Sequence, residues 1–403
     1  MDFSVILLLG LLLIIALLIP WFEGLLKNSR NLLIAILALA LAFAARAWFL
    51  DYASGDYDTF LVHWVDYYRT NGGFAGLANS LGNYNIPYLY FLALFSYLPI
   101  NDLYLIKLLS IAFDIILAFS MMKLTGVFTR SVTKRLAAFL ITLLLPTVVL
   151  NGAMWGQCDS IYVAFALLSL WLVLSDRPKL SMVFMALSFG FKLQAIFLMP
   201  VFLVMLFAKK IKFRQLFVFP LAYIALILPA VLLGRPFMDA ITLYFNQAGS
   251  IGSYLNYNSP SIFAFFQNGD NAALSAAFIA LALLFVLAIF LLAFRRRGSL
   301  NNEALLGISL LFVVGIPFLL PHMHDRYFFM ADVLSLLPAV LYLRYSPITA
   351  LTSFASFLCY FSYLTGQFLL PLSFGAVALL GVLLLLFTFT LDRLNSRRSK
   401  KLK

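Results

Sequence analysis

The chain is dominated by apolar runs that are each long enough to cross a bilayer as a helix. One example is NLLIAILALALAFAARAWFL (31–50), and similar runs recur from one end of the sequence to the other. About 17 to 25 apolar residues span a hydrocarbon core, and in lipid a spanning segment must satisfy its own backbone hydrogen bonds. Hydrophobic residues make up 64% of the 403 residues, against roughly half in soluble domains. The sequence therefore predicts an all-α, polytopic membrane protein.

We expect about thirteen transmembrane helices within one integral-membrane domain, residues 1–403. The segment 86–99 is apolar but short and bounded by prolines, so it is expected to be an outer-leaflet or re-entrant helix. The first segment, 3–22, lacks a basic flank and a cleavage site and is predicted to be a retained helix. The thirteen helices are predicted near 3–20, 31–50, 102–122, 136–151, 160–175, 180–194, 196–208, 215–233, 272–294, 304–320, 329–343, 348–364 and 372–391.

Positive charge is confined to particular segments of the chain. Of the 28 Lys and Arg residues, 22 fall in short inter-helix segments such as KKIKFR (209–214) or in the tail DRLNSRRSKKLK (392–403). Loops rich in Lys and Arg stay in the cytoplasm, so we expect the N-terminus outside and the C-terminus cytoplasmic. The net charge of +12 then indicates topology and contact with anionic membrane lipid, and no nucleic-acid partner is implied.

The first long outer segment, DYASGDYDTFLVHWVD (51–66), carries four aspartates. A carboxylate near the membrane surface can act as general base for an acceptor hydroxyl, and Asp56, after the flexible Gly55, is the first candidate. Asp58 is the second candidate. Either side chain can instead be a solvated loop charge.

The motif NYNIPYLY (83–90) places Asn83, Tyr84 and Asn85 before an aromatic segment. Tyrosines also form belts at membrane interfaces, which offers a purely structural explanation for Tyr84. The two asparagines are not needed for anchoring, so we include the motif among the candidate binding segments.

In NGAMWGQCDSIY (151–162), Trp155 and Gln157 combine an aromatic face with an amide, as sugar-binding sites do. Asp159 follows at the start of a predicted helix, where the helix dipole alone would favour a carboxylate. We therefore expect this motif to shape a sugar or acceptor pocket, with a structural role for Asp159 as the alternative.

Two lysines fall inside apolar segments. Lys192 in FKLQAIF (191–197) is an intramembrane lysine, which is by default a functional candidate, and Gln194 follows it. Lys107 and Asp114 are seven residues apart, two turns on one helix face, and are interpreted as a buried structural pair or packing contacts.

The motif PHMHDRYFF (321–329) contains two of the three histidines. His322 and His324 resemble half of a metal site, but no thiol or carboxylate pattern completes it. Arg326 offers a forked donor matched to phosphate, and His324 can donate beside it. We therefore interpret the motif as an anion-binding segment.

Candidate carboxylates and phosphate ligands on one outer face suit a lipid-phosphate substrate, whose tail would lie in a groove between helices. Walker, Rossmann and zincin motifs are absent from the sequence. Two other classes stay open: a transporter or flippase of a lipid-linked glycan, which would place polar residues near the bilayer midplane, and a non-catalytic assembly subunit.

The motifs SGDYDTF (54–60), NYNIPYLY, WGQCDSIY (155–162), FKLQAIF and PHMHDRYFF, in this order, resemble the GT-C superfamily of integral-membrane glycosyltransferases. The chain is most similar to bacterial relatives of the second mannosyltransferase of GPI-anchor synthesis. By this resemblance residues 1–30 are an extra N-terminal helix and loop, 31–214 the core, and 215–403 variable C-terminal helices.

The resemblance implies an inverting transfer of a hexose (mannose, glucose or galactose) from a polyprenyl-phosphate donor. The acceptor would be a glycan, wall polymer or glycolipid at the outer face of a bacterial plasma membrane. Asp56 matches the presumed general base, Arg326 and His324 the donor-phosphate ligands, and Lys192 a helper. No cofactor is required, although Asp56 and Asp58 could hold a divalent metal.

Overall fold

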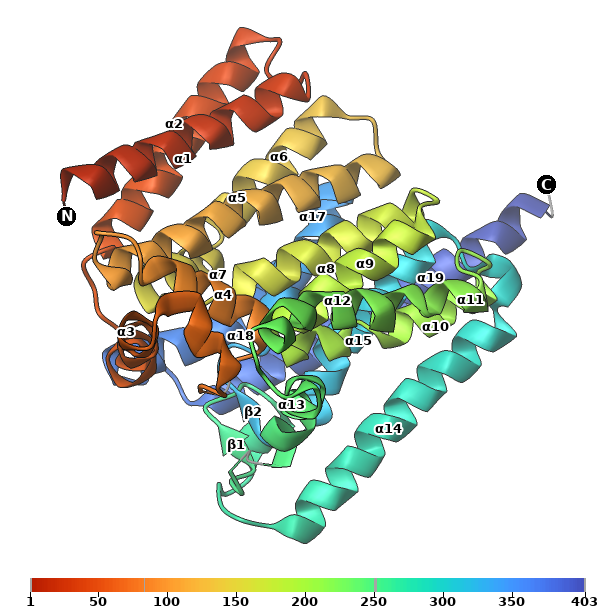
Figure 1. The fold of residues 1–403 in the computed structure, drawn as a ribbon. Coiled ribbons are helices and arrows are strands. Elements are labelled where there is room, and N and C mark those ends of the chain that lie inside the picture. The colour runs from red at the N-terminus through yellow and green to blue at the C-terminus, as the bar shows by residue number, and fades with distance from the viewer. Residues whose placement is uncertain (1, 83, 250–251, 402–403) are drawn as a thin grey trace.

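The computed structural model describes residues 2–82, 84–249 and 252–401, most of which are helical (Figure 1). Within them, eight helical segments are long and apolar enough to cross a membrane. They are α1 (Phe3–Phe22), α2 (Ser29–Phe49), α5 (Asp102–Phe128), α11 with α12 (Phe213–Leu232), α14 (Ala272–Arg295), α15 (Asn302–Leu319), η7 with α18 (Leu343–Thr365) and most of α19 (Leu372–Lys401). The prediction of an all-α polytopic membrane protein is confirmed.

The other predicted spans are shorter or broken. The single helix expected near 136–151 is wrong, because Pro146 starts a new helix and the chain bends there by 48°. Proline lacks the N–H that an uninterrupted helix needs. The broken span comprises α6 (Val132–Leu144), α7 (Pro146–Val149) and the π-helix η3 (Leu150–Trp155). The shorter ones are α8 (Asp159–Leu174), α9 (Pro178–Phe191), η4 (Leu193–Phe197) with α10 (Pro200–Phe207), and α16 (Phe329–Leu334) with α17 (Leu336–Leu341).

The described residues of the first long outer segment and of the segment between α12 and α14 fold into short elements at one end of the bundle (Figure 1). The segment 86–99 forms α4 (Ile86–Phe95), whose ten residues are too few for a crossing. The turns after α1, α5 and α8 lie at the opposite end. The short elements are η1 (Tyr57–Leu61), α3 (Val62–Thr70), η2 (Gly73–Ala78), α13 (Phe237–Gly249), β1 (Asn256–Tyr257), η5 (Ile262–Phe265) and β2 (Met323–His324), with η6 (Arg297–Ser299) at the other end. β1 pairs in parallel with β2.

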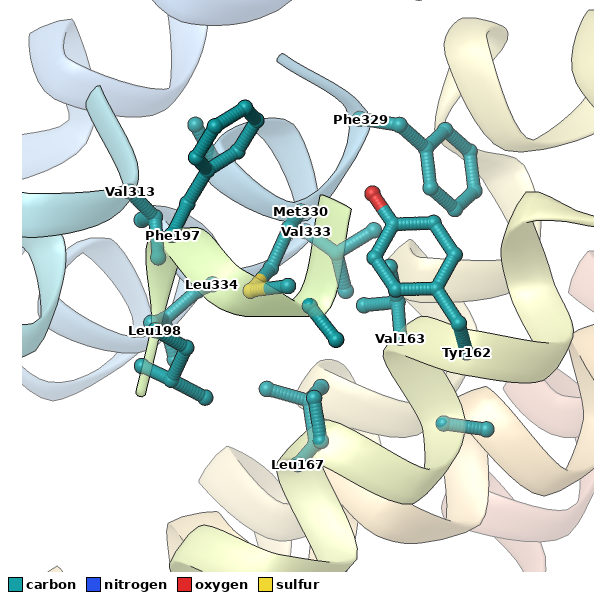
Figure 2. Packing of buried hydrophobic residues seen from close by; sticks show 14 of the residues in the cluster. Tyr162, Val163, Leu167, Phe197, Leu198, Val313, Phe329, Met330, Val333 and Leu334 are labelled. Atoms are coloured by element: carbon teal, nitrogen blue, oxygen red, sulfur yellow. The ribbon is translucent and has the colours of Figure 1, made fainter. Parts of the chain in front are cut away.

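A continuous apolar core joins the segments that carry the candidate motifs. Figure 2 shows α8, η4, α15 and α16 meeting through side chains such as Tyr162, Phe197 and Val333. Tyr162 lies one turn after Asp159, and Phe329 comes three residues after Arg326. Close packing in this core therefore fixes the helix ends from which the candidate residues project.

A second apolar cluster joins α1 and α2 to α5 and α6, and it contains a buried ion pair. Arg46 donates to Asp114 Oδ2 from Nε at 3.0 Å and from Nη2 at 2.8 Å, and both side chains are fully buried. Lys107 does not pair with Asp114. Its ammonium instead binds the backbone carbonyls of Phe49, Leu50 and Tyr52. Of the two interpretations of Lys107 and Asp114, the mutual pair is wrong, because each side chain is satisfied by α2 or by the residues that follow it.

The Arg46–Asp114 pair makes a stability prediction. Asp114→Ala leaves Arg46 charged and buried, and we expect the free energy of unfolding to fall by about 3–5 kcal/mol. The double variant Arg46→Met with Asp114→Leu removes both charges and should lose much less. Thermal unfolding of the purified protein measures both effects. Equal losses in the single and double variants would show that the pair itself stabilises the fold and that the loss does not come from the unpaired charge of Arg46.

Candidate active site

The first loop returns to the bundle and brings Asp56 against helix ends far along the chain. Lys107 holds the loop's start through the Tyr52 carbonyl, and the Ser54 hydroxyl donates to the Trp155 carbonyl at 2.6 Å. These two contacts fix the loop immediately before Asp56, at the first turn of η1.

The turn between η3 and α8 presents two donors to Asp56. Trp155 Nε1 donates to Asp56 Oδ2 at 2.9 Å, and Gln157 Nε2 donates to the same oxygen at 2.6 Å. Gly156 between them has φ +78°, a left-handed conformation that glycine adopts without steric cost. The turn therefore aims two side chains that are two residues apart at one carboxylate oxygen.

A residue that the sequence analysis missed completes the Asp56 contacts. The hydroxyl of Tyr363, near the end of α18, donates to Asp56 Oδ1 at 2.6 Å, and its ring stacks on Trp155. Each carboxylate oxygen can accept about two hydrogen bonds. Among the described residues Tyr363 is the one donor to Oδ1, so this oxygen retains room for another donor. In the sequence Tyr363 was indistinguishable from an interfacial tyrosine.

Arg326 reaches this cluster from the loop after β2. Its Nη1 lies 3.4 Å from Asp56 Oδ2, its Nε lies 4.0 Å from Asp159 Oδ2, and its guanidinium lies over the Trp155 ring. Nε is buried without a hydrogen-bond partner among the described residues. An arginine has five N–H donors, and among the described residues Nη1 donates to Asp56 while Nε has no partner.

Asp159 is a shared partner of the two cations Lys192 and Arg326. It is buried, forms an ion pair with Lys192, and accepts a hydrogen bond from Asn151 Nδ2 at 2.7 Å. Lys192 also lies over the Tyr84 ring. Asn151, from η3, is a second residue that the sequence analysis did not select. Asp159 thus holds Lys192 in place beside Arg326.

The structure places the remaining candidates at different distances from this cluster. Tyr84 donates to Gln157 Oε1 at 2.9 Å and so belongs to it. Asn85 instead caps α4 and donates to Tyr223, while Asn83 lies outside the described residues. Asp58 is exposed on η1, and Gln194 is buried in η4, where its Oε1 has no hydrogen-bond partner in the part of the chain that the structure describes.

Trp155 is fully buried, although the sequence suggested an open aromatic face. Its ring is covered by Tyr363 and Arg326, so its indole acts as a donor to Asp56 rather than as a surface on which a sugar can stack.

The two histidines have separate partners. His322 lies within hydrogen-bond distance of the Tyr254 carbonyl and of Ser275 through its two ring nitrogens. His324 stacks on Tyr257, with ring centroids 4.8 Å apart. Across residues 2–82, 84–249 and 252–401, no three His, Cys, Asp or Glu side chains are grouped closely enough to hold a metal ion.

Burial shifts the pKa values of His324 and Asp325, the two titratable groups beside Arg326, in opposite directions. Burial and the charge of Arg326 lower the pKa of His324 to about 4. Burial raises the pKa of Asp325 to about 7, although Arg326 acts against this rise. At neutral pH His324 is therefore a neutral donor or acceptor, and Asp325 neutralises Arg326 only in part.

These shifts predict opposing pH effects on stability. Between pH 4 and 6.5, folded His324 binds fewer protons than unfolded His324, so its contribution makes the free energy of unfolding rise with pH. Asp325 keeps its proton in the folded state from pH 3.8 to about 7, so its contribution falls with pH. From pH 4 to 6.5, the melting temperature of Asp325→Asn should rise more steeply with pH than that of the unmodified protein. The melting temperature of His324→Gln should rise less steeply. The same dependence of melting temperature on pH in all three proteins would refute this assignment.

Comparison with known families identifies the chain. The model of glycosyltransferase family 87 matches residues 83–320, more than half of the sequence. The chain belongs to glycosyltransferase family 87. This is a GT-C-type integral-membrane family with mannosyltransferase members, so the resemblance seen in the sequence is confirmed. No curated protein matches the chain.

The family match and the structure cover different parts of the site. Trp155, Gln157, Asp159 and Lys192 lie within residues 83–320, whereas Asp56 and Arg326 lie outside that range. The tertiary structure brings these two groups of residues together at one end of the bundle. The family establishes a membrane glycosyltransferase, and the geometry supplies candidate roles for its residues.

Proposed function

We propose that this family 87 glycosyltransferase moves a hexose from a polyprenyl-phosphate donor to an acceptor hydroxyl, with inversion at the anomeric carbon. The observation that carries the proposal is the meeting of Asp56 and Arg326 across 270 residues. Asp56 Oδ1 has room for another donor, and Arg326 Nε has no partner among the described residues. Base and phosphate ligand are thus adjacent.

The reaction proceeds by one displacement. The acceptor hydroxyl binds Asp56 Oδ1 beside Tyr363, gives its proton to that oxygen, and forms the new bond to the anomeric carbon. The bond from this carbon to the phosphate oxygen breaks, and its electron pair goes to the lipid phosphate. Arg326, with Lys192, stabilises the charge that develops on that phosphate. No metal has a required step.

An apolar cavity that extends from Ile196 of η4 toward the basic end of the bundle suits the donor's tail. Its volume is about 380 Å³, and all of its lining side chains are apolar, among them Met185, Phe219 and Phe290. Ile196 of η4 also lines it, one turn after Lys192. We propose that the phosphate meets Arg326 and Lys192 while the first isoprene units enter this cavity.

We place the active site on the outer face of a bacterial plasma membrane, with a glycan, wall polymer or glycolipid as acceptor. The reason is the charge distribution: α2 separates the basic turn at Lys27 and Arg30 from Asp56 by about 30 Å of helix. Nucleotide sugars are not supplied at that face, which favours a membrane-carried donor.

Transfer in detergent tests the function. Purified protein receives polyprenyl-phosphate mannose, glucose or galactose, each radiolabelled, with an alkyl hexoside acceptor and with EDTA in a parallel reaction. We expect transfer of at least one hexose, inverted anomeric configuration, and the same rate with EDTA. Transfer from a nucleotide sugar alone would contradict the donor assignment. Loss of activity with EDTA, restored by Mg²⁺ or Mn²⁺, would contradict metal independence.

A further inference from the structure

A polar cavity lies at the end of the bundle opposite the active site, and the proposed reaction does not use it. It measures about 300 Å³ and is lined by Lys123, Gly126, Thr129, Arg130, Arg135 and Trp171. α5 separates it from the catalytic end, because Lys107 holds the first loop near the start of this helix and the cavity lies at its last turns.

The cavity carries an excess of positive charge. Lys123 and Arg135 form ion pairs with the two oxygens of Glu23 at 3.0 and 2.7 Å, whereas Arg130 is exposed. Partial burial acts against ionisation, but Lys123 and Arg135 hold the pKa of Glu23 below its usual value. Three cations therefore face one carboxylate, which leaves charge for a further anion.

The cavity also has a donor with no partner and a gap kept open by a glycine. Arg135 Nε is buried and has no hydrogen-bond partner among the described residues. Gly126 lies three residues after Lys123 on the same face of α5, and Arg130 follows two residues beyond the end of that helix. A Cβ added at Gly126 would come 3.4 Å from Arg135 Nε. A larger side chain at Gly126 would thus fill the space in front of the unused donor.

We propose that this cavity binds the phosphate of an anionic phospholipid in the leaflet opposite the active site. Its position favours a lipid over a soluble anion: α5 has membrane-spanning length and the cavity lies at its end, where headgroups are found. Trp171 of α8, whose ring lies 5.3 Å from Lys123 Nζ, supplies an aromatic side chain of the kind enriched at that level. Basic pockets between transmembrane helices bind such headgroups.

Lipid titration monitored by native mass spectrometry tests the proposal. Full-length protein in detergent is titrated with phosphatidylglycerol, and the dissociation constant of the first retained lipid is measured. We expect Arg130→Gln to weaken this binding about fivefold, the effect of one cation near a lipid surface. Gly126→Leu should weaken it at least as much by filling the cavity without changing charge. Arg214→Gln, an equal charge change in another basic segment, should leave binding unchanged.

Three outcomes would overturn the proposal. If all three variants retain phosphatidylglycerol as the unmodified protein does, the cavity is not the lipid site. If inorganic phosphate at millimolar concentration displaces the first lipid and protects the protein equally against thermal unfolding, the site takes soluble phosphate instead. Phosphatidylcholine, titrated in parallel, should bind without dependence on Arg130, and a loss equal to that for phosphatidylglycerol would exclude recognition of the anionic headgroup. Because no arm measures transfer, the result is independent of the proposed reaction.

Discussion

Asp56→Asn is expected to lower kcat by about 10²- to 10⁴-fold, the usual contribution of a positioned general base. The amide preserves the size of the side chain and can still accept from Trp155 and Gln157, but it cannot take the proton of the acceptor hydroxyl. KM for the donor should change little, because we propose that Arg326 and Lys192, rather than Asp56, hold the donor phosphate. Steady-state transfer with varied donor concentration measures both constants.

Asp58→Asn is the matched control for this substitution. Asp58 is two residues away in the same loop but exposed, and its carboxylate is not part of the described Asp56 contacts. We expect its activity and melting temperature to match those of the unmodified protein. Normal transfer by Asp56→Asn would remove Asp56 from the role of base. A large loss in Asp58→Asn alone would assign that role to Asp58.

Arg326→Ala is expected to lower kcat/KM by about 10²- to 10³-fold, because removing one preorganised donor to developing charge has an effect of that size. Arg326→Lys keeps the charge but loses the fork that matches phosphate, so an intermediate loss is expected. Added guanidinium ions should restore part of the rate of the alanine variant, a rescue that a purely structural role would not produce.

Arg69→Ala provides the matched arginine control. Arg69 lies in α3 on the same side of the molecule but pairs with Asp66 and Asp102, away from Asp56. We expect transfer close to that of the unmodified protein. Equal losses in Arg69→Ala and Arg326→Ala would indicate a general effect on the segments at this end of the bundle rather than stabilisation of the leaving group.

The sequence was most informative where a single physical requirement acts on a whole segment. The length of the apolar runs predicted helices that cross a membrane, since only a helix satisfies its own backbone there. Motif content predicted Asp56, Arg326, Lys192 and Asp159 as site residues, and the structure brings all four together. The break at Pro146 was missed because apolar content by itself does not reveal a bend.

Other features depended on contacts between distant segments. Tyr363 is 307 residues from Asp56, and neither local pattern nor hydropathy distinguishes it from an anchoring tyrosine. Lys107 and Asp114 share a helix face, yet they have different partners. Asp114 pairs with Arg46, and Lys107 donates to backbone carbonyls of the first loop. Which partner a buried charge finds is decided by the helix that packs beside it.

The sequence by itself determined that this chain is a helical membrane protein with acidic and basic motifs of the GT-C kind. The tertiary structure decided which carboxylate meets which cation, and which residues only support them. The physical reason is range: bilayer insertion and helix formation act on consecutive residues, whereas hydrogen bonds to Asp56 join η1, the turn after η3, the loop after β2 and α18.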